Sequence, residues 1–398
     1  MRTRDPGATP VRAPERSQRW FDLALVALFV ASLGAMLAGV WLARPPGVLV
    51  LERRNMHPWP TTADSGYREW TAGFERAFGD RFGGRGVLTR LHHALKVALG
   101  ASPVDNVMLG RAGWLFFLGE DARALDRHYR GVAPLGTTVD AVVGEFERRN
   151  AALASRGIAY IVVVVPDKFS VYDEHLPRWV VRATATPLDR IAAAMKDRAD
   201  TRFLDLRAPL RAAKTTRRVY FRTDSHWNLI GASIGYEALM DEVRRALPGR
   251  MASPVPAPRP PYDPQRDRYS GDLATMLGSP SWLAEEDLAP LWKVYADASR
   301  RCAKRFEDDA TVQRTGRETF ECDAPRPRAM ILRDSMAIPW LPLVSENFSR
   351  TVWLATRRLD LQLVDAERPD VVVDQLVERS LGQVAAMTMV GGAKPAVP

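Results

Sequence analysis

Cysteine and histidine, the usual ligands of structural zinc, are scarce in this sequence. Its 398 residues include only two cysteines and six histidines, and no histidine lies near either cysteine. A structural zinc site takes about four cysteine or histidine ligands. We therefore expect neither a bound metal nor a cofactor.

A concentrated block of basic charge is also missing. The net charge of +9 comes mostly from arginines scattered along the whole chain. Nucleic-acid-binding proteins usually gather lysine and arginine on one face or stretch, so we expect no nucleic-acid partner. A solvated, arginine-rich surface explains the charge most simply, and attraction to an acidic polymer or an anionic membrane is the alternative.

One long apolar segment lies near the N-terminus. Residues 21–43 are almost wholly apolar, interrupted only by Asp22 and Ser32, and the arginines before them outnumber the acids. About 20 helical residues cross a bilayer core. The positive-inside rule then predicts a cytoplasmic tail at 1–20, an inner-membrane anchor at 21–43 and a periplasmic remainder. A cleaved signal peptide is the alternative, but its apolar region usually has about 7–15 residues.

The two cysteines agree with export. Cys302 and Cys322 are 20 residues apart in a polar segment. An even number of cysteines in an exported domain predicts a disulfide between them. Two unrelated thiols are the alternative.

Beyond the anchor, composition and pattern divide the chain further. Residues 44–100 combine a proline- and arginine-rich stalk with helical segments, and aromatic residues recur there at helical spacing from Tyr67 to Phe78. Such a stripe predicts core packing. Residues 101–385 are expected to form one domain with an irregular, proline-rich insert at about 248–328, and residues 386–398 a loose tail.

Alternating helical and strand patterns predict the fold of the 101–385 domain. The expected strands are residues 159–165, 202–206, 329–332, 352–354 and 371–373. The first of these is a continuous β-branched run, which is typical of a strand buried on both faces. The alternation predicts a mostly parallel sheet between two helical layers, an α/β/α sandwich. Before it, residues 106–118 predict a β-hairpin.

Two polar stretches carry candidate catalytic residues. Asp224 and His226 lie two residues apart, and Ser335 closely follows the apolar run 329–332. Together they supply an orienting acid, a base and a nucleophile, the three parts of an acyl-transfer site. Ligands bind beyond the carboxyl ends of strands in open α/β sheets, which is where Ser335 is expected, with the following backbone N–H groups free to hold an oxyanion. Each residue alone also has a structural explanation: a helix cap for Ser335, core packing for His226.

A series of motifs occurs in a defined order along the chain. They are Phe74–Arg85, Gly110–Phe117, Pro166–Lys168, Tyr172–Pro177, Thr223–Asn228, Ser270–Leu273 and Arg333–Ser335. Over roughly residues 70–380, this ordered set resembles the AlgJ/AlgX family of SGNH-hydrolase-like polysaccharide O-acetyltransferases. The order Asp, His, Ser is usual in that family.

The resemblance implies an SGNH-type α/β fold and specific roles. Ser335 matches the family's nucleophile, and Asp224 and His226 match its Asp-x-His pair. An acetyl group would pass to Ser335 and then to a hydroxyl of an exported polysaccharide, alginate or similar. Because acetyl-CoA is cytoplasmic, the resemblance also implies a donor partner of the membrane-bound O-acyltransferase type. We expect the shorter, anchored AlgJ-like layout.

Two other functions use the same sequence features. A polysaccharide acetyl esterase would employ the same three residues with water as the acceptor. A non-catalytic member would bind the polymer or act as a scaffold in a secretion complex. The sequence does not separate these from a transferase.

Five further residues are weaker candidates for substrate binding: Arg333, Lys168, Asp167, Trp227 and Asp272. Arg333 stands where many family members have glycine, and it either contacts an acidic sugar or pairs with a nearby acid. Asp167 and Lys168 follow the strongest predicted strand, with a local salt bridge as the alternative. Trp227 either stacks on a sugar or, as we favour, packs in the core.

Asn228, in the same stretch as His226, is a side-chain amide that could donate to an oxyanion. Asn228 is expected to be a turn residue in preference to an oxyanion donor.

Overall fold

The computed structural model describes residues 16–42, 48–49, 54–61, 66–82, 85–198, 200–251, 253–256, 267–278, 282–287, 302–305, 316–323, 325–387 and 389–390. The chain divides into two compact units, Met1–Leu95 and Lys96–Pro398. The predicted tail at 386–398 lies mostly outside the described residues, as do residues 1–15.

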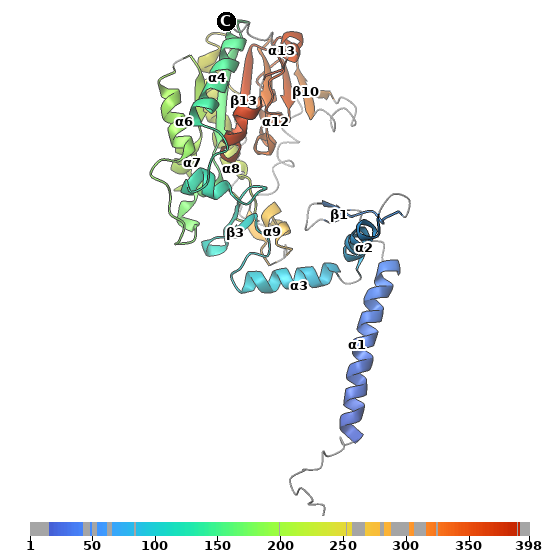
Figure 1. Cartoon of the computed structure of the whole chain (residues 1–398). Coiled ribbons are helices and arrows are strands. Elements are labelled where there is room, and N and C mark those ends of the chain that lie inside the picture. The colour runs from blue at the N-terminus through green and yellow to red at the C-terminus, as the bar shows by residue number, and fades with distance from the viewer. Residues whose placement is uncertain are drawn as a thin grey trace, which may run out of the picture. The chain divides into compact units, whose positions relative to one another are not determined.

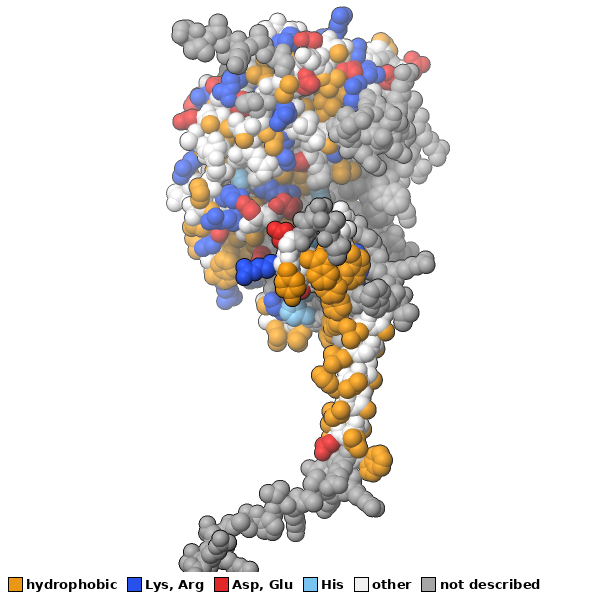
Figure 2. Space-filling model, turned by 45° about the vertical axis from the view of Figure 1, so that its right-hand side comes forward, with side chains coloured by type: hydrophobic (Ala, Val, Ile, Leu, Met, Phe, Trp, Pro, Cys, Tyr) orange, Lys and Arg blue, Asp and Glu red, His pale blue; other side chains and the backbone are white. Residues whose placement is uncertain are grey.

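The first unit is mainly helical. It contains α1 (Arg16–Leu42), α2 (Tyr67–Arg81), most of α3 (Arg85–Ala98) and the short pair β1 (Val48–Leu49) and β2 (Arg54–Asn55). Hydrophobic side chains are exposed along the described part of α1 (Figure 2). Within the described part of the chain, no helix is both long and apolar enough to cross a membrane. Several side chains of α1, at 16–19, 36 and 39–42, lie outside that part, so the anchor stays a prediction.

The aromatic stripe of α2 forms a row of ring contacts. Trp70 stacks on Phe74 with ring centroids 5.4 Å apart, and Phe74 stacks on Phe78 at 5.9 Å. Phe74 is nevertheless 40% exposed. Tyr67, the first residue of the stripe, is 83% exposed. The expectation of core packing is therefore wrong for these two residues.

A seven-stranded sheet organises the second unit (Figure 1). Its order is β6 (Arg202–Asp205), β5 (Ala159–Val165), β13 (Val371–Val377), β11 (Arg328–Leu332), β12 (Arg350–Leu354), β10 (Arg317–Cys322) and β9 (Cys302–Arg305). The first five strands pair in parallel, and β10 and β9 add antiparallel pairings at one edge. The sheet is thus mostly parallel, as predicted.

Side chains alternate between two cores, as the period of a strand requires. On β5, Ile161 and Val163 face a cluster formed with α7 (Arg207–Lys214), α8 (Leu229–Ala246) and α12 (Trp340–Ser345). Val162 and Val164 face the opposite cluster, formed with α4 (Val139–Ala154), α6 (Pro187–Lys196) and α13 (Leu361–Glu367). Helices therefore cover both faces of the sheet, which confirms the α/β/α expectation.

Smaller elements complete the unit. The predicted hairpin is present as β3 (Val107–Leu109) paired with β4 (Leu115–Phe117). The segment expected to be irregular contains β7 (Asp267–Tyr269), α9 (Asp272–Met276) and β8 (Glu285–Asp287), besides β9 and β10 of the main sheet. These short polar strands lack the apolar run that identifies a buried strand. The rest of residues 248–328 lies largely outside the described residues, so the irregular insert stays a prediction there. The predicted disulfide joins Cys302 to Cys322, which lie opposite each other on β9 and β10.

Candidate active site

Ser335 lies just beyond the carboxyl end of β11, at the start of a short 3₁₀ turn, Ser335–Ala337. Asp334 fixes this turn: its Oδ1 accepts from the Met336 N–H at 2.9 Å and the Gln375 amide at 3.0 Å, and its Oδ2 accepts from the Val377 N–H at 2.7 Å. Gln375 and Val377 belong to the neighbouring strand β13. Asp334 is therefore the helix cap, while the Ser335 side chain remains exposed.

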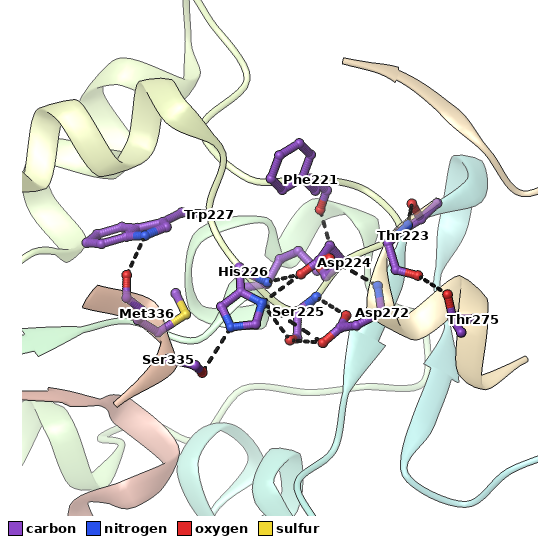
Figure 3. A network of polar contacts seen from close by, with 12 residues as sticks. Phe221, Thr223, Asp224, Ser225, His226, Trp227, Asp272, Thr275, Ser335 and Met336 are labelled. Carbon is purple, nitrogen blue, oxygen red and sulfur yellow. Dashed lines mark hydrogen bonds and ion pairs between the residues drawn. The ribbon is translucent and has the colours of Figure 1, made fainter. Parts of the chain in front are cut away.

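His226 connects Ser335 to Asp224 (Figure 3). Its Nε2 lies 2.9 Å from the Ser335 Oγ, and its Nδ1 lies 2.7 Å from the Asp224 Oδ1. The His226 N–H also donates to the same carboxylate oxygen at 2.9 Å. The two candidate stretches, separated by more than a hundred residues in sequence, thus form one hydrogen-bonded chain from acid to imidazole to hydroxyl.

The second oxygen of Asp224 is held by a segment that the sequence did not single out for this purpose. Its Oδ2 accepts from the Tyr269 hydroxyl at 2.5 Å and from the Asp272 N–H at 3.0 Å. Gly271, between these residues, lies so close to the other loop that a Cβ there would be 2.3 Å from the Thr223 carbonyl oxygen. The glycine is therefore needed for the two loops to approach.

Asp272 is a brace of the Asp224–His226 loop, and the prediction that it binds substrate has no support in its contacts. Its carboxylate accepts from the Ser225 N–H at 2.7 Å and the Ser225 hydroxyl at 2.6 Å, and lies 3.9 Å from His226 Nδ1. Asp224, His226 and Asp272 together bring three possible metal-ligand atoms within 4.8 Å of one another. Those atoms already take part in the hydrogen bonds described above, which accounts for their closeness.

The pKa values of Asp224 and His226 are shifted in opposite directions. Burial lowers the pKa of His226, but the hydrogen bond and charge of Asp224 outweigh it and raise the pKa above its usual 6.5. Burial alone would raise the pKa of Asp224, yet its bonds to His226 and Tyr269 hold that pKa well below the usual range. Asp224 therefore stays ionised and stabilises a protonated imidazole.

Lys168 stabilises the backbone of the loop that carries Asp224. This corrects its prediction as a substrate-binding residue. Its buried ammonium donates to the backbone carbonyl oxygens of Phe221 and Arg222, each at 3.0 Å, and of Asp224 at 2.6 Å. An ammonium has three N–H donors, so none remains for a ligand. Burial lowers the pKa of Lys168 to about 8.

Asp167 is also buried and does not line the cavity beside Ser335. Its carboxylate pairs with the Arg379 guanidinium, and its N–H donates to Glu378 at 3.0 Å. The alternative of a salt bridge was therefore the correct one. Burial raises the pKa of Glu378 to about 8, and the neighbouring charge of Asp167 adds to this.

The remaining weak candidates have structural roles. Trp227 is fully buried against Trp340, and its indole N–H donates to the Met336 carbonyl at 2.9 Å, so it joins the histidine loop to the serine turn. Arg333 pairs with Glu318 at 2.8 Å. Asn228 caps α8 by accepting from the Ile230 and Gly231 N–H groups, and its amide donates to the Arg218 carbonyl at 2.8 Å, a local backbone role like the one expected of it.

A cavity of about 480 Å³ opens beside Ser335. It is lined by Phe117, Gly119, Glu120, Asp121, Ala124, Arg127, Asp334, Ser335, Arg357, Val377, Arg379, Ser380 and Gln383. Arg357 donates to the Ser380 hydroxyl at 2.7 Å, and its buried Nε has no partner among the described residues. Arg357 was missed from the sequence because it lies in no recognisable motif and reaches the cavity only through the packing of the sheet.

A family model agrees with this architecture. The sequence model of the SGNH hydrolase-like domain of the acetyltransferase AlgX matches residues 107–317, more than half of the chain. The match confirms the predicted SGNH-like α/β fold and stops short of Ser335.

Two curated relatives illustrate the similarity. The probable alginate O-acetylase AlgJ of Pseudomonas syringae pv. tomato is 25% identical over 256 residues, covering 64% of this chain and 60% of the relative. The protein of the same name from Pseudomonas aeruginosa is 30% identical over 174 residues, covering 43% and 41%. The chain thus matches less than two thirds of the length of either relative.

Solved structures are more distant. The O-acetyltransferase domain of Pseudomonas putida AlgJ aligns with a TM-score of 0.41 and 21% identity, covering 70% of this chain and 92% of that one. Bacillus cereus PatB1 aligns with a TM-score of 0.46 and 14% identity, covering 72% and 98%.

Proposed function

The chain belongs to the family of SGNH hydrolase-like domains typified by the acetyltransferase AlgX, and from that premise we propose that it transfers acetyl groups onto hydroxyls of a polysaccharide. The observation that carries the proposal is the hydrogen-bonded chain Asp224–His226–Ser335, with its serine at the mouth of a cavity. The curated relatives are named for alginate, so alginate is the first polymer to test.

The proposed mechanism has two half-reactions. In the first, His226 Nε2 takes the Ser335 proton as Oγ attacks the donor's acetyl carbonyl; the donor's leaving group then departs with that proton. In the second, His226 takes the proton of a sugar hydroxyl, whose oxygen bonds to the acetyl carbon. The bond to Ser335 Oγ breaks, and the proton returns to the serine. Asp224 stabilises the imidazolium in both.

The oxyanion needs donors near Ser335. The expected Met336 N–H is already bonded to Asp334, and the Ala337 N–H donates to the Asp334 carbonyl at 3.3 Å. We therefore assign this role to the Ser335 N–H and the Arg357 guanidinium. Arg357 shares the cavity with Ser335, and its Nη2 donates to the Ser380 hydroxyl at 2.7 Å and lies 3.6 Å from the Asp334 carboxylate, which holds the guanidinium near the serine. A preorganised cationic donor of this kind lowers the barrier by stabilising the charge that develops on oxygen.

The proposed location is the periplasmic side of the inner membrane. The disulfide Cys302–Cys322 favours an oxidising compartment, and the arginine-flanked apolar segment 21–43 supplies a candidate anchor. Since acetyl-CoA would be on the other side, the acetyl donor in this proposal is a membrane-bound O-acyltransferase-type partner.

An acetyl esterase is the second candidate. The exposure of Ser335 favours it, because water can then reach an acetyl-serine as readily as a sugar can. Incubating the protein with p-nitrophenyl acetate, with and without polymer, separates the two: a transferase yields acetylated polymer, whereas an esterase yields only acetate.

The test of the catalytic serine uses a fluorophosphonate probe and the same transfer assay. Ser335→Ala should abolish both labelling and polymer acetylation. Ser233→Ala is the matched control, because the Ser233 hydroxyl is buried without a partner among the described residues. Labelling or transfer that survives in Ser335→Ala would rule out this mechanism, and loss in both variants would indicate a folding defect.

A further inference from the structure

Helix α3 carries an exposed apolar stripe. Val87, Leu88, Leu91 and Leu95, with Leu99 just after the helix, are between 46% and 76% exposed. At 3.6 residues per turn, these positions fall on one side of the helix. Five large apolar side chains in one row on a solvent-facing helix are uncommon in a soluble domain.

The opposite side of α3 is the one that packs against the protein. His93 lies there and is buried, and Thr89, on the same side, is half-buried. The apolar stripe is therefore not a core face that happens to be partly open. It is a second face, turned away from the side on which the helix already has contacts.

The charges of α3 are all of one sign. The helix contains Arg85, Arg90 and Lys96, and it has no aspartate or glutamate among its 14 residues. On the helical projection, Arg90 flanks the stripe on one side and Lys96 on the other. Long basic side chains beside an apolar stripe can extend to lipid phosphates while their methylene groups stay with the apolar face. This arrangement is complementary to an anionic lipid surface.

The first unit also carries exposed aromatic rings outside α3. Trp59 and Phe74, whose ring centroids lie 5.5 Å apart, are 38% and 40% exposed. Aromatic side chains are enriched where a protein meets the boundary between lipid headgroups and acyl chains.

We propose that α3 lies in the interfacial region of an anionic lipid bilayer, with Leu88, Leu91 and Leu95 inserted among the acyl chains. A protein partner that covers the stripe is an outcome that the test below distinguishes. The proposal depends neither on the acetyl-transfer activity nor on α1 crossing the membrane.

Fluorescent labels on opposite sides of α3 test the proposal. One cysteine is introduced into the full chain as Leu91→Cys, Leu95→Cys or Thr89→Cys and labelled with an environment-sensitive dye; Cys302 and Cys322 are paired and do not react. The protein is mixed with vesicles of phosphatidylethanolamine and phosphatidylglycerol containing acyl-chain quencher lipids. Labels at 91 and 95 should be quenched about threefold more than the label at 89, which lies on the opposite face.

Three results would overturn the proposal. Equal quenching at 89 and 91 would mean that the stripe does not face lipid. A dye at 91 that reports an apolar environment before vesicles are added would mean that a second copy or another part of the chain covers the stripe. Equal insertion into phosphatidylcholine vesicles would remove the role of the basic residues. Matching thermal unfolding of the three variants verifies that each is folded.

Discussion

The Tyr269 hydroxyl offers the sharpest test of how the candidate triad is held. Tyr269→Phe removes the donor 2.5 Å from Asp224 Oδ2 while keeping the ring that lies 4.6 Å from Phe221. Three donors to Asp224 remain: two from His226 and the Asp272 N–H. Asp224 therefore stays ionised, and the variant probes its charge and position without deleting either.

Two consequences of different kind follow from this change. A hydrogen bond to a charged group contributes about 1.5–3 kcal/mol, so the free energy of unfolding should fall by roughly 2 kcal/mol at pH 7. A carboxylate with one donor fewer also concentrates more negative charge towards His226 and raises the pKa of the imidazole further. Since the base works only when neutral, the acidic limb of kcat/KM should move to higher pH.

The measurements are denaturant unfolding and the pH profile of p-nitrophenyl acetate turnover. Tyr160→Phe is the matched control, because the Tyr160 hydroxyl donates to the buried Asp374 at 2.8 Å, in contacts separate from the triad. It should lose stability without moving the acidic limb. Asp224→Asn should move the limb to lower pH, because it removes the charge that raises the His226 pKa. A Tyr269→Phe variant whose limb stays in place, or moves to lower pH, would refute the reasoning.

Three further predictions concern residues that support the site. The pKa of Glu378 is about 8 in the folded protein and ordinarily 4.5, so the native protein loses stability as pH rises between these values, by up to about 1.4 kcal/mol per pH unit. Glu378→Gln should flatten this pH dependence of the free energy of unfolding, which urea titrations from pH 5 to 8 measure. Lys168→Met removes the ammonium that donates to the Phe221 and Asp224 carbonyls, while the Arg222 carbonyl keeps the Leu115 N–H as a donor. Unfolding in urea should therefore show a loss of about 2 kcal/mol or more, whereas a substrate-binding lysine would change KM alone. Gly271→Ala places a Cβ against the Thr223 carbonyl, which should displace the 223–226 loop and lower kcat on p-nitrophenyl acetate at least tenfold; unchanged kcat would show that this close approach is not required.

The strands of the central sheet were predictable because their signal is local. A strand buried on both faces needs a continuous apolar run, and the run at 159–165 coincides with β5 in the structure. Strand β9, at the edge of the sheet, and its neighbour β10 carry no such run. Their residues were therefore assigned to an irregular insert.

The roles of the charged residues beside the site were harder to predict, because residue type does not distinguish a ligand-binding group from a structural one. Lys168, Asp167 and Arg333 all have the chemistry to bind a sugar. Their partners decide the matter: three carbonyls for Lys168, Arg379 for Asp167 and Glu318 for Arg333. These partners come from distant parts of the chain, and no local pattern identifies them.

By itself, the sequence determined the residue types of the acid, base and nucleophile, the disulfide pair and the alternation that produces the α/β/α sheet. Each of these rests on spacing or composition within a short segment, or on an ordered set of such segments. Only the tertiary structure decided how the acid is held, because Tyr269 and Asp272 reach Asp224 through a close approach of two loops that Gly271 permits. The same is true of Arg357, which joins Ser335 at one cavity through the packing of neighbouring strands.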